Sequence, residues 1–304
     1  MERLRIATLV LLAAIGMPLI STGQGTVGDV DAAYQREVHK FRAEEIKDLK
    51  SNWLLLAGLF WLKPGDNAFG TASSNSIVLP AGTAPAKAGV FELNDGEVTL
   101  KMKPGAAALI DGEPVMTARL QPDTAGKPTV VALGRLRMHV INRGERVGVR
   151  LKDLQNPALR NFTSLRFYPI DRAYRVTGTW VPSDGKRRVD VPNVLGDVTH
   201  ETVPGEVRFT VNGQQLTLTA LGGDPAKGLF FVFSDTTSKT DTYPAGRFLE
   251  TDAVKDGTVV LDFNKAYNPP CGVTPYATCP IAPKENRLAV AIPAGEKFDH
   301  SRPH

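Results

Sequence analysis

The spacing of hydrophobic residues changes along the chain, from a helical period near the N-terminus to the alternation of β-strands. Over residues 29–50 apolar side chains recur every three or four positions, at Val30, Tyr34, Val38, Phe41 and Leu49. This spacing is typical of an amphipathic α-helix. Asp29 or Asp31 can cap its first turn. The pattern predicts one N-terminal helix within residues 24–52.

Residues 53–156 have the pattern of short strands separated by Gly and Pro turns. The apolar run 54–62 indicates a buried strand. Further strands are predicted at residues 89–93, 98–102, 107–110, 130–133, 137–142 and 146–151. Regularly spaced short strands are typical of a β-sandwich.

A polar segment at 157–169 separates this half from a second set of strands. These are predicted at residues 174–181, 188–191, 205–211, 215–220, 229–234, 246–250 and 259–263. Residues 230–233 are apolar without alternation, so we expect both faces of that strand to be covered. The sequence therefore predicts an all-β protein of two packed sandwich- or barrel-like halves, 53–156 and 157–298, preceded by one helix and followed by a tail at 299–304.

The stretch from Leu261 to Leu288 combines prolines, asparagines and both cysteines of the chain. Its prolines exclude a helix interior and a central strand, and alternating apolar residues predict a return to extended structure at 286–292. A bond between Cys271 and Cys279 closes a loop of nine residues, counting both cysteines, and this closure stabilises by roughly 2.5 kcal/mol. A metal or redox pair is the alternative, but the pair offers too few ligands for zinc and lacks the C-x-x-C spacing. We expect a structural disulfide.

The first 23 residues resemble a Sec-type signal peptide. Arg3 and Arg5 precede an apolar run at 6–15, which is too short to span a bilayer, and small residues follow at Ser21-Thr22-Gly23. We therefore expect export to the periplasm or secretion, without a stable membrane anchor, in a compartment that permits disulfides. The alternative is an uncleaved N-terminal membrane anchor.

Charge and motif content exclude several classes of function. The net charge is +4, and its one tight basic cluster, Lys186-Arg187-Arg188, lies in a turn, so we expect no nucleic-acid partner. None of the common nucleotide-, phosphate- or zinc-binding motifs is present, nor is G-x-S-x-G. Only two of the five histidines are close in sequence. We expect neither a metal nor a cofactor, and the sequence leaves the oligomeric state open.

Two resemblances to known families emerge from these residues. Residues 64–80 resemble the start of a forkhead-associated sandwich, but Thr71 replaces the phosphate-binding Arg and no Ser-Arg-x-x-His follows, so phosphopeptide binding is not expected. Asp262-Phe-Asn-Lys-Ala-Tyr-Asn-Pro-Pro-Cys271, Tyr276-Ala-Thr-Cys-Pro280 and Asn286-Arg-Leu288 resemble the signature of the uncharacterised bacterial domain-of-unknown-function family sixteen-eighty-four. Earlier segments from Trp53, Lys152 and Asp241 extend the resemblance over nearly the whole chain. It implies no known reaction, substrate or cofactor.

Candidate chemistry is concentrated at strand ends in the C-terminal half. The polar residues there are Asp235, Tyr243, Arg247, Asp262, Asn264, Tyr267, Asn268, Asn286 and Arg287. One interpretation is buried Arg–Asp pairs that hold loops in place. The other is a pocket for a small polar or anionic ligand, such as a glycan or cell-envelope fragment, with Arg247 or Arg287 clamping an anion.

Two further hypotheses remain for the function. Asp235 and Asp262 could act as the acid/base pair of a hydrolase, provided that their carboxyl groups face one cleft. A purely structural or interaction role is the other alternative. The hypothesis of ligand binding without chemistry agrees best with the sequence, because no catalytic motif accompanies the polar residues.

Overall fold

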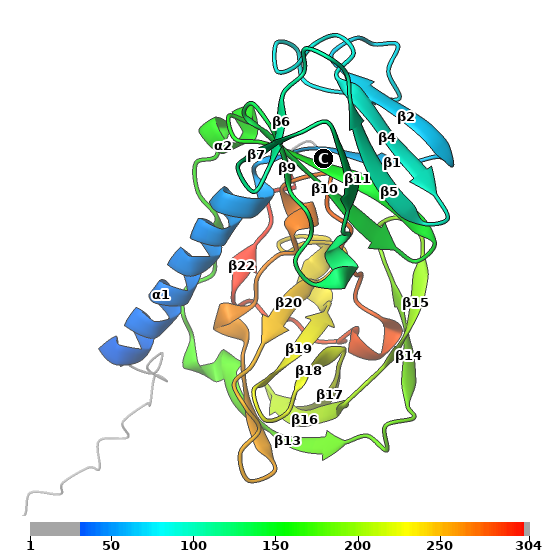
Figure 1. Cartoon of the computed structure of the whole chain (residues 1–304). Helices are drawn as coiled ribbons and strands as arrows, with labels where there is room; N and C mark the ends of the chain where they lie inside the picture. Colours follow the sequence, from blue (N-terminus) through cyan, green and yellow to red (C-terminus); the bar gives the residue numbers. More distant parts are fainter. Residues whose placement is uncertain (1–30, 301–304) are drawn as a thin grey trace, which may run out of the picture.

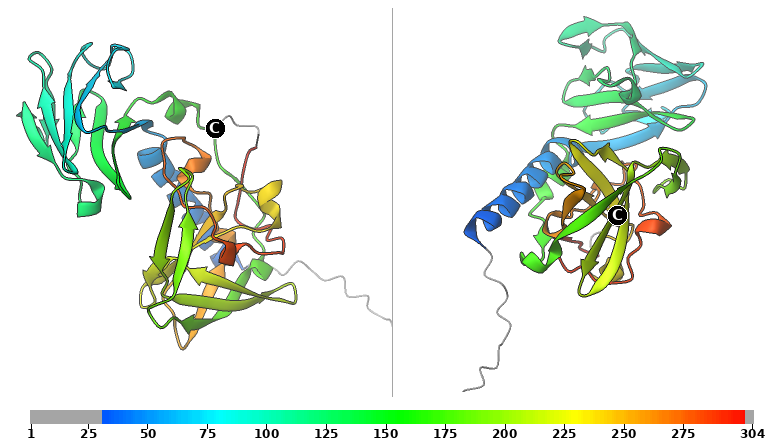
Figure 2. Two further views of the ribbon diagram at one scale, coloured as in Figure 1. Left: turned by 90° about the vertical axis from the view of Figure 1, so that its right-hand side faces the viewer. Right: turned by 90° about the horizontal axis from the view of Figure 1, so that it is seen from below.

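The computed structural model describes residues 31–300 and shows two lobes joined along one side (Figures 1 and 2). The predicted signal peptide and most of the predicted tail lie outside these residues. One hydrophobic core lies within residues 62–151 and a second within residues 207–294. The fold is all-β apart from its N-terminal helix, as predicted, while the residue limits of the two domains stay a prediction.

Helix α1 (Ala32–Asp48) runs along the C-terminal lobe and ends at the junction with the N-terminal lobe (Figure 1). The side chain of Asp31 caps the helix by accepting a hydrogen bond from the backbone N–H of Ala33 at 2.8 Å. Tyr34 and Val38 are buried on one stripe, as the spacing predicts. The helix then widens into a π-turn, η1 (Leu49–Trp53), which carries the Trp53 ring to the junction.

Two antiparallel sheets form the N-terminal sandwich. One consists, in spatial order, of β1 (Leu56–Trp61), β11 (Arg146–Asp153), β10 (Leu136–Arg143), β9 (Val131–Leu133), β6 (Ala108–Ile110) and β7 (Glu113–Val115). The other, in which only the short β2–β3 pairing is parallel, consists of β3 (Ile77–Val78), β2 (Gly65–Gly70), β4 (Gly89–Asn94), β5 (Glu97–Met102) and β8 (Thr117–Leu120). Phe69 and Phe91 stack at 4.6 Å in the core between the sheets.

The β10–β11 hairpin has one apolar and one basic face. Val149 and Leu151 point into the sandwich core. Successive side chains of a strand point to opposite faces, so Arg150 and its cross-strand partner His139 lie on the face away from that core. This face is turned toward the C-terminal lobe, where Arg143 donates a hydrogen bond to Thr278.

The C-terminal lobe is built from small sheets. A four-stranded sheet orders β17 (Gln214–Ala220), β16 (Gly205–Val211), β13 (Arg175–Pro182) and β21 (Thr258–Asp262), and a three-stranded sheet orders β18 (Gly222–Asp224), β19 (Gly228–Phe233) and β20 (Arg247–Glu250). Two strand pairs accompany them, β14 (Arg188–Pro192) with β15 (Val198–Thr202) and β12 (Arg166–Phe167) with β22 (Glu296–Lys297). The short helical segments are α2 (Pro157–Asn161), η2 (Asp123–Ala125), η3 (Arg172–Tyr174), η4 (Thr236–Lys239), η5 (Phe263–Lys265), η6 (Pro270–Gly272) and η7 (Lys284–Asn286).

Strand β19 is covered on both faces, as its unbroken apolar run predicts. Phe231 and Phe233 belong to the main C-terminal core. Phe230 and Val232 point the other way and pack with Cys279 under the proline-rich loop. The loop thus acts as the second cover of this strand.

The strands near the candidate polar residues belong to separate sheets, and the predicted return to a strand at residues 286–292 is wrong. The strands that end near Asp235 and Asp262 do not share a sheet, because β19 and β20 pair with each other whereas β21 pairs with β13. Leu288, Val290 and Ile292 alternate and are buried, but they form no strand. That segment instead contributes single backbone bonds, such as Leu288 N–H to Ser234 O at 2.8 Å.

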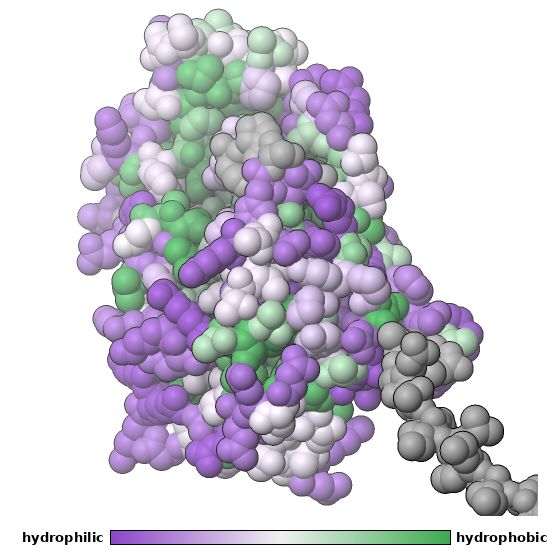
Figure 3. Space-filling model, turned by 180° about the vertical axis from the view of Figure 1, so that it is seen from behind, coloured by the Kyte–Doolittle hydropathy of each residue, from purple (hydrophilic) through white to green (hydrophobic). Residues whose placement is uncertain are grey.

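The surface seen from behind is mostly hydrophilic, with hydrophobic residues in groups between hydrophilic ones (Figure 3). The large hydrophobic side chains that are exposed come from both lobes, for example Met116 and Val198. None of the helices in the described range is long and apolar enough to cross a membrane.

Candidate functional site

The structure confirms the predicted disulfide. Cys271 and Cys279 are bonded, with their Cα atoms 6.1 Å apart. Cys279 is buried beside Val232 and Phe248, so the bridge fixes the loop against β19 and β20. Both cysteines therefore serve the packing of this loop.

Asp235 and Arg247 form a buried ion pair. Arg247 Nη2 lies 2.7 Å from Asp235 Oδ2, and the two side chains are only 1% and 0% exposed. Arg247 also donates to the carbonyls of Ile292 and Ala294, and Asp235 caps η4 through the N–H of Thr237. Every contact of this pair is internal to the lobe, so it holds loops together, as one of the two interpretations proposed.

Asp262 belongs to a different network. Its Oδ1 accepts a hydrogen bond of 2.8 Å from the Tyr34 hydroxyl of α1, and Arg175 lies 3.7 Å from its Oδ2. Asn264, fully buried, donates to the Tyr34 hydroxyl and to the carbonyl of Asp171. This cluster joins the helix to β21.

The proposed acid/base pair is therefore wrong. Asp235 and Asp262 lie in separate buried networks, each held by its own arginine, and neither carboxylate lines the cleft between the lobes. The cause is the sheet arrangement, which places β21 apart from β19 and β20.

The remaining predicted residues divide between structural and cleft positions. Asn286 bonds to the backbone of Thr219 and Val232 and thereby ties β17 to β19. Arg287 is exposed, and Tyr243 packs edge-on against Phe298. Only Tyr267 and Asn268 line the hollow region at the junction of the lobes.

A cleft of about 470 Å³ lies at that junction. Its walls come from three parts of the chain: the end of α1 with η1, the β10–β11 hairpin, and the C-terminal lobe. The lining residues are Glu45, Asp48, Trp53, Arg143, Arg150, Phe248, Glu250, Tyr267, Pro270, Ala277, Thr278, Cys279 and Pro280. The disulfide loop thus forms one rim of the cleft.

The N-terminal wall is basic. Arg150 is only 7% exposed, yet its guanidinium makes no hydrogen bond or ion pair with any residue of the described range. Burial first, then the charge of Arg143, lowers the pKa of Arg150 to about 10. Burial, with the positive charges of Arg150 and Lys152, also lowers the pKa of His139 to about 4. The wall therefore has an excess of positive charge.

Arg143, unlike Arg150, has hydrogen-bonding partners within the described residues. It pairs with Asp123 at 2.8 Å and donates through Nε to Thr278 at 3.0 Å. This second contact crosses from the sandwich to the disulfide loop. Arg143 accordingly links the sandwich to the disulfide loop, whereas Arg150 is available to a ligand.

The opposite wall carries three carboxylates. Trp53 Nε1 donates to Asp48 at 3.0 Å, and the Tyr267 hydroxyl donates to Glu250 at 2.8 Å. The carboxylate of Glu45 has no hydrogen-bond or ion-pair partner among the described residues. Burial, followed by the charges of Glu250 and Asp48, raises its pKa to about 7. This side of the cleft lacks positive charge.

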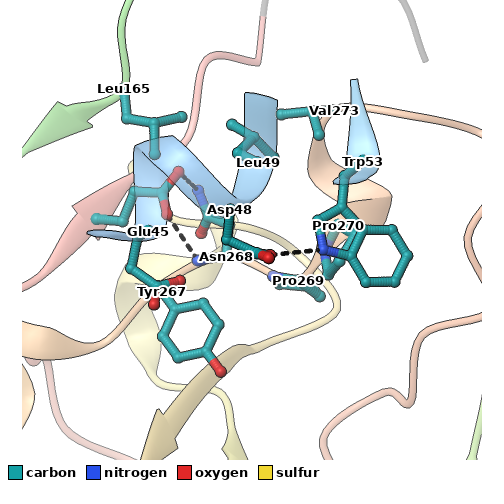
Figure 4. A pocket seen from close by; sticks show the side chains of 11 residues that line it. Glu45, Asp48, Leu49, Trp53, Leu165, Tyr267, Asn268, Pro269, Pro270 and Val273 are labelled. Atoms are coloured by element: carbon teal, nitrogen blue, oxygen red, sulfur yellow. Dashed lines mark hydrogen bonds between the residues drawn. The ribbon is translucent and has the colours of Figure 1, made fainter. Parts of the chain in front are cut away.

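A smaller pocket of about 50 Å³ shares Glu45, Asp48, Trp53, Tyr267 and Pro270 with the lining of the cleft (Figure 4). Asn268 and Glu296 both line this pocket. Asn268 donates hydrogen bonds from its backbone N–H and from its side-chain Nδ2 to the carboxylate of Glu296, each at 2.8 Å. Glu296 is 4% exposed, and burial raises its pKa to about 8. A protonated Glu296 therefore fits this enclosed position at neutral pH.

Most of the cleft could not be found by searching for motifs. The sequence pattern does carry one signal, since strand alternation places Arg137, His139 and Arg143 on one face of β10 and Arg150 and Lys152 beside them on β11. A second signal is Glu45, a carboxylate on the apolar helix stripe, four residues after Phe41 and four before Leu49, whereas Asp48 looks like an ordinary solvent-facing charge. Only the fold brings these two walls together.

The carboxylates of the cleft do not make a metal site. Within residues 31–300 no three His, Cys, Asp or Glu side chains are close enough to share a metal ion. The charged groups that line the cleft can bind charged groups of a ligand, and the aromatic ones can stack on flat groups of a ligand. Burial and Glu250 raise the pKa of the Tyr267 hydroxyl, so this hydroxyl stays protonated.

Comparisons with solved structures give partial likenesses. The uncharacterized protein from gene locus rrnAC0354 of Haloarcula marismortui, solved in solution, is 29% identical over 47% of this chain and 80% of its own, with a TM-score of 0.39. Two forkhead-associated domains are each 13% identical over 31% of this chain, with TM-scores of 0.23. One comes from an analysis of phosphothreonine-dependent interactions, and the other is that of FhaA bound to the intracellular domain of Rv3910. This chain covers 92% and 97% of them.

A search of curated proteins finds no match. A family model described as "Protein of unknown function (DUF1684)" matches residues 160–297. That range contains the motifs from Asp262 to Leu288 but not the segment from Trp53, so the match is shorter than the resemblance in the sequence. The resemblance of the sequence to this family is thus confirmed over residues 160–297.

Proposed function

We propose that the protein binds a small anionic ligand in the cleft between its lobes, without covalent chemistry. One observation carries this proposal: Arg150 is buried and lines the cleft, yet it has no anionic partner in the described range. Buried charges in proteins are normally paired, because removing an ion from water costs several kcal/mol. A carboxylate or phosphate of a ligand would compensate Arg150.

The size and lining of the cleft support the same proposal. A volume of about 470 Å³ falls within the range of roughly 300–1,000 Å³ that is usual for small-molecule sites. Trp53 and Tyr267 supply flat apolar surface. The guanidinium carbon of Arg150 lies 5.9 Å from the centroid of the Trp53 ring. An arginine held against an aromatic ring is well oriented for bidentate binding of an anion.

Binding is tested by thermal shift and calorimetry with a panel of anions. The panel contains phosphate, citrate, glucuronate and muramic acid, so that glycan and cell-envelope sources are both represented. Arg150→Met should weaken the strongest hit by about tenfold to a hundredfold, since a hydrogen bond to a charged group contributes roughly 1.5–3 kcal/mol.

Arg137→Met is the matched control. Arg137 lies on the same face of β10 but bonds to the carbonyls of Gly134 and Leu136 and does not line the cleft. The control should bind like the wild type. Equal affinities of the Arg150 and Arg137 variants, or no hit at all, would refute the proposed site.

We also propose that the protein is exported. The predicted signal peptide and the Cys271–Cys279 disulfide support this location, because such bonds persist in oxidising compartments. Cell fractionation of the full-length protein, with N-terminal sequencing of the product, is the test. A product that stays in the cytoplasm with Met1 intact would contradict export.

A further inference from the structure

We infer that the ligand of the cleft is a zwitterion, a small molecule with an anionic group at Arg150 and an ammonium group at the wall of Glu45, Asp48 and Glu250. This inference rests on the proposed function, because it adds a second charge to a ligand that Arg150 anchors. It names the chemical class of the ligand and assigns a role to the acidic wall.

The acidic wall has no counter-charge of its own. None of its three carboxylates forms an ion pair with a basic residue of the described range, although sixteen such pairs occur elsewhere in that range. Burial of Glu45, together with repulsion from the nearby charges of Glu250 and Asp48, raises the pKa of its carboxyl group. A bound cation would relieve this repulsion.

The basic wall does not supply that cation. Lys152 reaches only the side chain of Asn52, at 3.1 Å, and Asn52 in turn donates to Asp48. Arg143 forms an ion pair with Asp123 and donates a hydrogen bond to Thr278. No ion pair therefore joins the basic residues to the acidic residues that line the cleft.

The aromatic residues complete a site suited to ammonium rather than to a metal. Trp53 and Tyr267 each hold one carboxylate in place by donating a hydrogen bond to it. Aromatic faces beside carboxylates attract an alkylammonium group through cation–π and Coulomb interactions. The three carboxylates form no metal-binding group within the described residues, but they can surround an organic cation.

The probes are ω-amino acids from glycine to aminooctanoate, each compared by calorimetry with the alkanoate and the alkylammonium of equal length. The proposed function predicts that alkanoates bind through Arg150. The inference predicts in addition that an ω-amino acid of matching length binds at least tenfold more tightly than its alkanoate. Equal affinities would overturn the inference and leave the proposed function standing. No binding by any probe would overturn both.

Two variants assign the ammonium group to its wall. Glu45→Gln should lower the preference for the ω-amino acid over its alkanoate by about tenfold in Kd, because only the ω-amino acid has an ammonium group to lose this contact. Glu44→Gln, an exposed neighbour on the same helix, is the control and should not change this preference. Arg150→Met should weaken both ligand classes. If Glu45→Gln lowers stability but keeps the tenfold preference, the acidic wall is structural and the inference is wrong.

Discussion

Replacing Arg247 by Met tests the assignment of the Asp235–Arg247 pair to stability rather than binding. Met preserves much of the side-chain volume but removes the ion pair and the bonds to the carbonyls of Ile292 and Ala294. Asp235 then remains buried without its counter-charge. Breaking a buried ion pair in this way lowers the free energy of unfolding by about 3–5 kcal/mol. Because two carbonyls also lose their donor, we expect the loss for this variant to lie at the upper end of that range. For a lobe of this size, the melting temperature should fall by roughly 10 °C or more.

Urea unfolding followed by tryptophan fluorescence measures this change, because Trp180 packs against the C-terminal core. Arg287→Met is the control: this arginine is exposed, and its replacement should stay within about 0.5 kcal/mol of the wild type. Asp235→Asn keeps a capping oxygen for η4. Combined with Arg247→Met, it should therefore cost less than the sum of the two single variants. A loss below about 1 kcal/mol for Arg247→Met would refute the reasoning, as would weakened ligand binding by the folded variant.

Two further changes have defined outcomes. Replacing Cys271 and Cys279 together by Ser should cost less than about 2.5 kcal/mol, because the neighbouring prolines already restrict the unfolded loop; limited proteolysis should find new cleavage in that loop and none in the sandwich. Glu296 has a folded-state pKa of about 8 against an ordinary value of 4.5, so its contribution to stability is full below pH 4.5 and is lost as the pH rises through 8. The loss is on the order of 5 kcal/mol, and Glu296→Gln should flatten the fall of melting temperature between pH 5 and pH 9; an unchanged slope would contradict the assignment.

Local patterns were sufficient to predict most strands of the sandwich. Turns rich in Gly and Pro and strict alternation define strands such as β4 and β5 without any tertiary information. The disulfide was equally accessible, because a short loop in an otherwise cysteine-free chain leaves one pairing. The unbroken apolar run of β19 also predicted its two covered faces correctly.

The cleft could not be predicted because sequence neighbours do not form it. Arg150 and Glu45 belong to different lobes, and their meeting depends on the packing of α1 against residues more than two hundred positions away. The polar residues of the C-terminal signature, in contrast, were visible but ambiguous. Asn264, Asn286 and Arg247 are buried by the tertiary fold, and only that burial shows that they hold the backbone rather than a ligand.

The contact of Tyr34 with Asp262 has a consequence for folding. Tyr34 of helix α1 precedes its partner Asp262 by 228 residues, and the whole sandwich lies between them in the sequence. The sandwich is in effect an insertion within the C-terminal lobe, so it can fold while the helix still waits for β21. A fragment cut at residue 157 would lack α1 and expose Asp262 and Asn264, whereas a fragment in which a short linker replaces the sandwich would keep them covered.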